Sequence, residues 1–134
     1  MEKKAVQNEK MSRQEAENVF YEWLDNEFEL SREDVANNEI KMQSAELVIS
    51  TIRNGRVTLG NDVLYKLRSP LGNITEITLK SRIEVSKLPT STKDSIANQA
   101  LKMLEARTGV PATILGSMDV FDFNRAAAIT AFFG

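Results

Sequence analysis

The apolar residues of this chain change period twice, and this change restricts the fold more than any other feature of the sequence. Apolar positions in residues 12–54, and again after Pro89, are spaced three and four apart, as on one face of an α-helix. Residues 57–85 instead alternate apolar and polar side chains, which is typical of half-buried strands. We therefore predict a mainly helical α+β domain, in which helices cover the apolar side of a small antiparallel sheet.

The chain begins with a polar segment, residues 1–11, which we expect to be a flexible tail before a single domain of residues 12–134. Ser12 and Glu15 have the spacing of a capping box, so a first helix is expected to begin there and to end between residues 28 and 30. Its acidic residues are interpreted as the solvated face of this helix: Glu15, Glu17, Glu22, Asp25, Glu27 and Glu29.

A second N-terminal helix is expected to begin at Ser31, where Asp34 would favour the helix dipole. Asn37-Asn38 weakens its first turns, so a start nearer Glu39 is the alternative. Gly55 follows the last apolar position and is expected to adopt the left-handed conformation that ends many helices.

The alternating segment is divided by two turn signals, at residues 60–62 and 69–73. The strands expected between them cover residues 57–59 and 63–67, and a third runs from Ile77 to Val85. This pattern predicts an antiparallel hairpin or a three-stranded meander with its polar face outward.

Two to three helices are expected in the C-terminal part of the chain. The first would be capped by one of the hydroxyl residues 90–92 and closed at Arg107-Thr108-Gly109, with the cation near the negative end of the helix. Residues 110–115 form a short helical turn or a connector. Ser117 is expected to cap the final helix, with Asp119 in its first turn.

The chain contains no cysteine and no histidine, so thiolate and imidazole chemistry is absent. It also lacks the glycine-rich loops of the common nucleotide-binding sites. The protein is therefore not expected to be an enzyme, and no catalytic residue, metal site or cofactor is predicted. Because the sequence shows neither a membrane-spanning apolar run nor an apolar secretion signal, we expect a cytoplasmic protein.

Asp119 and Asp122 are the one pair of carboxylates that raises the question of a metal or acid-base site, since they lie three residues apart on one helical face. One turn of helix supplies too few ligands to enclose a cation. The favourable interaction of acidic residues with a helix N-terminus is the preferred interpretation.

Charge is distributed unevenly along the sequence. Residues 1–34 contain five basic and ten acidic side chains, whereas residues 52–107 contain ten basic and five acidic ones. Such a bipolar chain suits head-to-tail self-association, with Arg53, Arg56 and Arg68 as candidate contact residues. A merely solvated charge distribution is the alternative. A nucleic-acid-binding regulator is less favoured, because the cations are spread singly and few aromatic residues lie among them.

Phenylalanine is concentrated at the C-terminus, where Phe121, Phe123, Phe132 and Phe133 fall within 14 residues. Neighbouring positions cannot share one helical face, so either the helix is covered on several sides or part of this aromatic surface is left for another subunit. Both interpretations remain open from the sequence, and the four residues are candidate interface residues.

The second half of the chain resembles a known family. The order Leu-x-x-Pro-Leu-Gly in residues 67–72 followed by Ile-Thr-Glu-Ile-Thr-Leu-Lys in residues 74–80 is similar to the small tail assembly chaperones of long-tailed bacteriophages. Residues 106–111, 118–123 and 129–133 are similar to later segments of that family. The likeness covers residues 63–134 and leaves the acidic N-terminal part unexplained.

The resemblance implies a non-enzymatic protein that acts during tail construction and is absent from the finished particle. Members of the family coat the long helical tape measure protein and recruit the tail tube subunit. The expected partners are therefore these two proteins and further copies of the chain, in the cytoplasm of the host cell. A permanent structural component of the virion is the alternative that the same resemblance leaves open.

Overall fold

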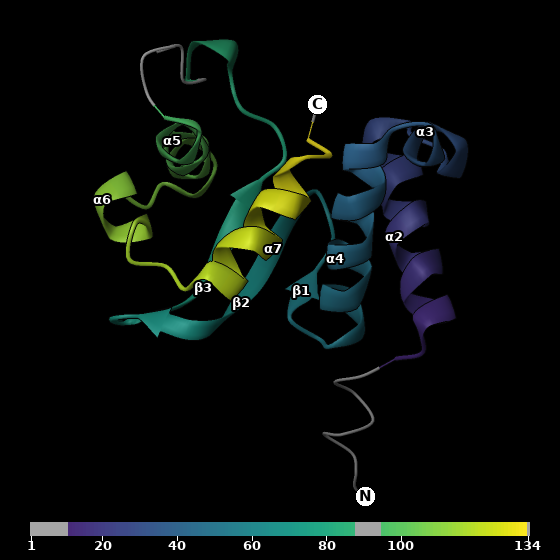
Figure 1. Cartoon of the computed structure of the whole chain (residues 1–134), viewed down its shortest axis with the longest axis horizontal. Coiled ribbons are helices and arrows are strands. Elements are labelled where there is room, and N and C mark those ends of the chain that lie inside the picture. The colour runs from purple at the N-terminus through teal and green to yellow at the C-terminus, as the bar shows by residue number, and fades with distance from the viewer. Residues whose placement is uncertain (1–10, 88–94, 134) are drawn as a thin grey trace, which may run out of the picture.

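The computed structural model describes residues 11–87 and 95–133, and its helices pack on one side of a three-stranded antiparallel sheet (Figure 1). The elements are α2 (Arg13–Phe28), α3 (Arg32–Ala36), α4 (Glu39–Arg53), β1 (Val57–Thr58), β2 (Asp62–Leu71), β3 (Ile74–Lys80), η1 (Val85–Lys87), α5 (Ile96–Thr108), α6 (Ala112–Leu115) and α7 (Val120–Thr130). The expectation of a mainly helical α+β domain is confirmed.

The starts of the N-terminal helices follow from local capping. Ser12 and Glu15 form a complete capping box at the start of α2, and Ser31 and Asp34 form a second one at the start of α3. The expected second helix is divided, because α3 is short and the side chain of Asn38 accepts a hydrogen bond that begins α4. Three helices therefore stand where the sequence predicted two.

The sheet is a meander with strand order β1-β2-β3, in which Tyr65 pairs with Val57 on one side and Ile77 on the other. The expected turn at residues 69–73 is shorter than predicted, since β2 continues to Leu71 and only residues 72–73 separate it from β3. Alternate residues of β2 from Asp62 to Arg68 are exposed and buried, so one face of the sheet is solvated and the other is covered by helices.

The prediction that the third strand continues to Val85 is wrong. β3 ends at Lys80, and a single turn of 3₁₀-helix occupies Val85–Lys87. The guanidinium group of Arg107 donates hydrogen bonds to the carbonyl groups of Lys80 and Ser81, at 2.8 and 3.1 Å. These two carbonyl groups are therefore satisfied by a side chain from α5 where the strand ends.

The caps of the C-terminal helices also differ from the prediction. Ser95 caps α5, and the predicted caps at residues 90–92 lie outside the described residues. Gly109 ends α5 in the left-handed conformation, as Gly55 does after α4, so both glycine predictions are confirmed. Asp119, rather than Ser117, caps α7. An aspartate adjacent to the first helical residue accepts the amide hydrogen bond directly.

The hydrophobic core lies where α7 packs between α4 and the sheet (Figure 1). α2 packs on α4 at one side of the molecule, while α5 packs against β3 at the other. Edge-to-face and tilted ring contacts join the two ends of the chain, and the rings involved are Phe20, Trp23, Phe28, Phe132 and Phe133. The terminal helix is thus covered by several elements of its own domain.

Candidate protein-interaction site

The carboxylate of Asp122 fixes the first turn of α7 against β2. Its Oδ1 accepts hydrogen bonds from the Tyr65 hydroxyl at 2.6 Å and from the Arg68 amide at 2.9 Å. Its Oδ2 accepts one from the Ser69 amide at 3.0 Å, and the whole residue is buried. The two amides belong to the part of β2 where the pairing with β3 is irregular. The carboxylate of Asp122 therefore takes the place of a strand partner for the amides of Arg68 and Ser69.

The environment of Tyr65 changes its titration. Burial raises the pKa of the Tyr65 hydroxyl above its ordinary value, and the hydrogen bond to Asp122 raises this pKa further. A buried phenol that donates to a carboxylate loses its proton with difficulty, because ionisation would place two negative charges side by side. The pair is consequently a structural contact that persists at neutral pH.

This raised pKa predicts how stability changes in alkaline solution. The folded-state pKa of Tyr65 exceeds the unfolded value, so its contribution to stability is complete below about pH 10 and is lost as pH rises further. The free energy of unfolding should fall by about 1.4 kcal/mol per pH unit from this group. Urea unfolding from pH 9 to 11 should show a shallower fall for Tyr65→Phe than for the native chain. Equal slopes would contradict the assignment.

Next to this contact, three arginines surround the ring of Phe121. The guanidinium carbons of Arg125 and Arg68 lie 3.5 and 3.8 Å from the ring centroid, and that of Arg56 lies 5.9 Å away. Two guanidinium groups this close would overlap on one face, so Arg68 and Arg125 cover opposite faces of the ring. We call Phe121 and its three arginines the arginine clasp.

Asp119 connects the arginine clasp to the start of α7. Its Oδ2 accepts a hydrogen bond from the Phe121 amide at 3.1 Å and forms an ion pair with Arg68, also at 3.1 Å. The clasp thus holds three cations around Phe121 at the positive end of the α7 dipole, and one of them, Arg68, is paired with Asp119. Both aspartates, Asp119 and Asp122, are occupied by donors from the protein. In the parts of the chain that the structure describes, no three acidic side chains are grouped so that they could hold a metal ion.

The other residues predicted for an interface have different environments. Phe132 and Phe133 are buried, as expected from the first of the two interpretations, in which the C-terminal segment is covered on several sides. The helix ends at Thr130, so these two rings are no longer bound by helical geometry and both point into the core. Phe123 is half-buried against the core. Arg53 is exposed at the end of α4, and no ring contact or ion pair involves it among the described residues.

Arg107 has a role that the sequence did not reveal. It was expected to act as a cation at the end of a helix, but it is buried. Its guanidinium carbon lies 4.6 Å from the centroid of the Phe133 ring, while its Nη1 bonds to the end of β3. Burial lowers the pKa of this guanidinium below its ordinary value. The position of Arg107 at a helix end does not indicate this contact, because the carbonyl groups that it binds are 27 and 26 residues away in the sequence.

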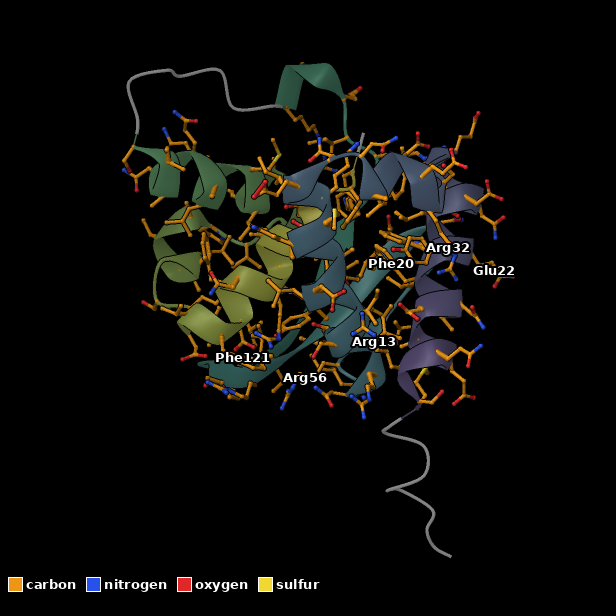
Figure 2. The ribbon with its side chains drawn as sticks, turned by 45° about the vertical axis from the view of Figure 1, so that its right-hand side comes forward. Arg13, Phe20, Glu22, Arg32, Arg56 and Phe121 are labelled. Atoms are coloured by element: carbon orange, nitrogen blue, oxygen red, sulfur yellow. The ribbon has the colours of Figure 1, made fainter. Side chains whose placement is uncertain are left out.

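A second feature is an apolar groove between the N-terminal helices. It has a volume of about 280 Å³ and is lined by Tyr21 of α2, Val35 and Ala36 of α3, and Met42, Gln43, Ala45 and Glu46 of α4. Met42 is 48% exposed within it. Arg32 covers the Tyr21 ring at 4.3 Å, and Arg13 pairs with Glu46 at 2.7 Å. Figure 2 shows the positions of Arg13 and Arg32. The groove therefore offers apolar side chains beside charged groups that are already partnered.

The structure is a small α+β domain with a cluster of cations around Phe121 and an apolar groove between α2, α3 and α4. No family model, no curated protein and no solved structure matches the chain. Of the helices in residues 11–87 and 95–133, none is long and apolar enough to cross a membrane.

Proposed function

We propose that this protein is a non-enzymatic tail assembly chaperone of a long-tailed bacteriophage. It self-associates and binds the tape measure protein and the tail tube subunit while the tail is built. The resemblance in residues 63–134 supports this proposal from the sequence, and the apolar groove between α2, α3 and α4 is the structural observation that carries it.

The groove suits an apolar side chain on an amphipathic helix of the client. Three helices form its walls, and most of its lining is apolar. Peptide helices commonly place one or two large apolar anchors into grooves of this kind. Burial of such an anchor contributes about 1.5–3 kcal/mol, which is enough to shield a client reversibly without permanent attachment.

The arginine clasp gives less support to the alternative of a nucleic-acid-binding regulator. Aromatic side chains bind single strands by exposing a ring face on which a base can stack. In this chain Arg68 and Arg125 cover both faces of Phe121. The cations are held around a half-buried ring, and this arrangement favours contact with carboxylates.

The proposal expects a very long helical protein to be encoded in a neighbouring reading frame, and co-expression of the chain with that protein tests it. The native chain should keep this client soluble and be retained with it on an affinity column. Met42→Asp places a charge in the groove and should reduce retention more than about tenfold. Ile96→Asp is the matched control, because Ile96 is 86% exposed at the start of α5, and it should retain the client normally.

Two outcomes would contradict the proposal. The first is equal retention of the client by the native chain and Met42→Asp. The second is a genome in which no very long helical protein is encoded near this chain. Recovery of the chain in stoichiometric amounts from purified tails would instead favour the permanent virion component.

A further inference from the structure

The C-terminal half of α2 and the residue after it carry three exposed acidic side chains, while a fourth, Glu27, is paired with Arg82. Glu22 and Asp25 are exposed and lie three residues apart on one face of α2, and Glu29 follows directly after the helix. Figure 2 shows Glu22 on the outer side of α2. Within the described residues, the side chains of all three are without a hydrogen bond or ion pair. The last turn contains no basic residue, although the C-terminus of a helix favours cations. We call Glu22, Asp25 and Glu29 the acidic end of α2.

The arginine clasp has the opposite electrostatic character. It brings three guanidinium groups to the N-terminus of α7, where the helix dipole adds further positive potential. Arg68 already pairs with Asp119, whereas no carboxylate is paired with Arg56 or Arg125 among the described residues. A second molecule with carboxylates could therefore bind these two guanidinium groups without displacing an existing ion pair.

The spacing of the two surfaces is compatible. The Cβ atoms of residues three or four apart on a helix lie about 5–6 Å from each other. The guanidinium carbons of Arg125 and Arg56, the two arginines of the clasp without an ion pair in the described part of the chain, lie 3.5 and 5.9 Å from the same ring centroid, so at most about 9 Å separates them. A helical pair such as Glu22 and Asp25 can thus reach two arginines of the clasp at once.

The two surfaces cannot meet within one molecule. Figure 2 shows Glu22 at the outer side of α2, while Phe121 and Arg56 lie away from it at the lower end of the molecule. We propose that the arginine clasp of one copy binds the acidic end of α2 of a second copy. Because the contact joins two different surfaces, a pair of copies still has one free clasp and one free acidic end, to which further copies can bind.

This contact between copies specifies the self-association that is part of the proposed function. Its biological role rests on that function, whereas the contact itself does not. Sedimentation velocity of the chain alone, at low salt and without client, measures it directly. The native chain should form species larger than dimers, and added salt should dissociate them. If self-association fails while client retention persists, only this inference is overturned.

Two charge reversals give a sharp test. Arg56→Glu disables the clasp, and Glu22→Lys disables the acidic end, so each variant alone should be monomeric, with its dissociation constant raised more than about tenfold. An equimolar mixture should form dimers and nothing larger, because the one intact clasp meets the one intact acidic end. Lys87→Glu makes the same charge change on η1, outside the clasp, and should associate like the native chain.

The controls distinguish this contact from its rivals. Circular dichroism verifies folding, and Arg56→Gln, which keeps most of the side-chain stem, should weaken association in the same direction if Arg56→Glu does not fold. A native chain that remains monomeric or stops at a symmetric dimer, or a mixture that stays monomeric, would overturn the proposal. So would binding of a single-stranded oligonucleotide that Arg56→Glu abolishes in a chain that does not self-associate, because the clasp would then be a nucleic-acid site.

Discussion

Replacement of Asp122 by Ala is expected to lower the free energy of unfolding by about 3–5 kcal/mol, which is a large part of the stability of a small domain. The substitution leaves the Tyr65 hydroxyl and the amides of Arg68 and Ser69 without their acceptor in a buried place. An unsatisfied buried donor costs about 1–3 kcal/mol, and the effect is larger when the lost partner is charged. The substitution also removes the hydrogen bonds that connect the first turn of α7 to β2.

Urea unfolding followed by the fluorescence of the buried Trp23 measures this loss. Asp119→Ala is the matched control on the same helix, because it removes a partly exposed cap and should cost about 1 kcal/mol. Tyr65→Phe removes only one of the three donors and should fall between the native chain and Asp122→Ala. If Asp122→Ala costs no more than Asp119→Ala, the buried carboxylate does not hold α7 in place.

Truncation after Ala128 is expected to abolish cooperative unfolding. It removes Ile129, Phe132 and Phe133, all of which are buried. Phe132 contacts Phe20 edge to face at 5.2 Å, so the cut also leaves the first helix without its aromatic partner. The single substitution Phe132→Ala should cost about 3–5 kcal/mol, because the cavity lies at the contact between the two ends of the chain.

Far-UV circular dichroism during thermal unfolding tests this second prediction. Val120→Ala is the control, since Val120 is 70% exposed on the same helix and should change stability by less than about 0.5 kcal/mol. A truncated chain that still unfolds in one sharp transition would show that the C-terminal rings are dispensable for the fold and free for a partner.

Features that depend on a few neighbouring residues could be predicted from the sequence. The capping boxes at Ser12 and Ser31 and the left-handed Gly55 and Gly109 need only their local chain to form. The meander followed from the alternation of apolar residues, which requires only that one face be buried.

Features that depend on distant partners could not be predicted. The charge pattern pointed to Arg56 and Arg68, but Arg125 joins them only because α7 lies beside β2 in the fold. Asp122 has the same sequence signal as any acidic residue in a first helical turn, and its donors are more than 50 residues away. Sequence spacing gives no information about which surface a side chain will meet.

The position at which α7 ends decides how the last aromatic residues are interpreted. Adjacent rings must face different directions only within a helix. Phe132 and Phe133 follow Thr130, where α7 ends, so both rings can face the core. Helix ends are uncertain by one or two residues in sequence-based reasoning. Here two residues decide whether a pair of aromatic rings belongs to a partner surface or to the core.

Size-exclusion chromatography with multi-angle light scattering tests most directly whether this protein acts by binding other proteins. The sample is the chain co-expressed with the very long helical client that the proposed function expects in a neighbouring reading frame. Several copies of the chain should elute with each client molecule, and the complex should shrink when Arg56→Glu replaces the native chain. Elution of the chain as a free monomer, with the client insoluble or unbound, would contradict both the proposed chaperone function and the proposed contact between copies.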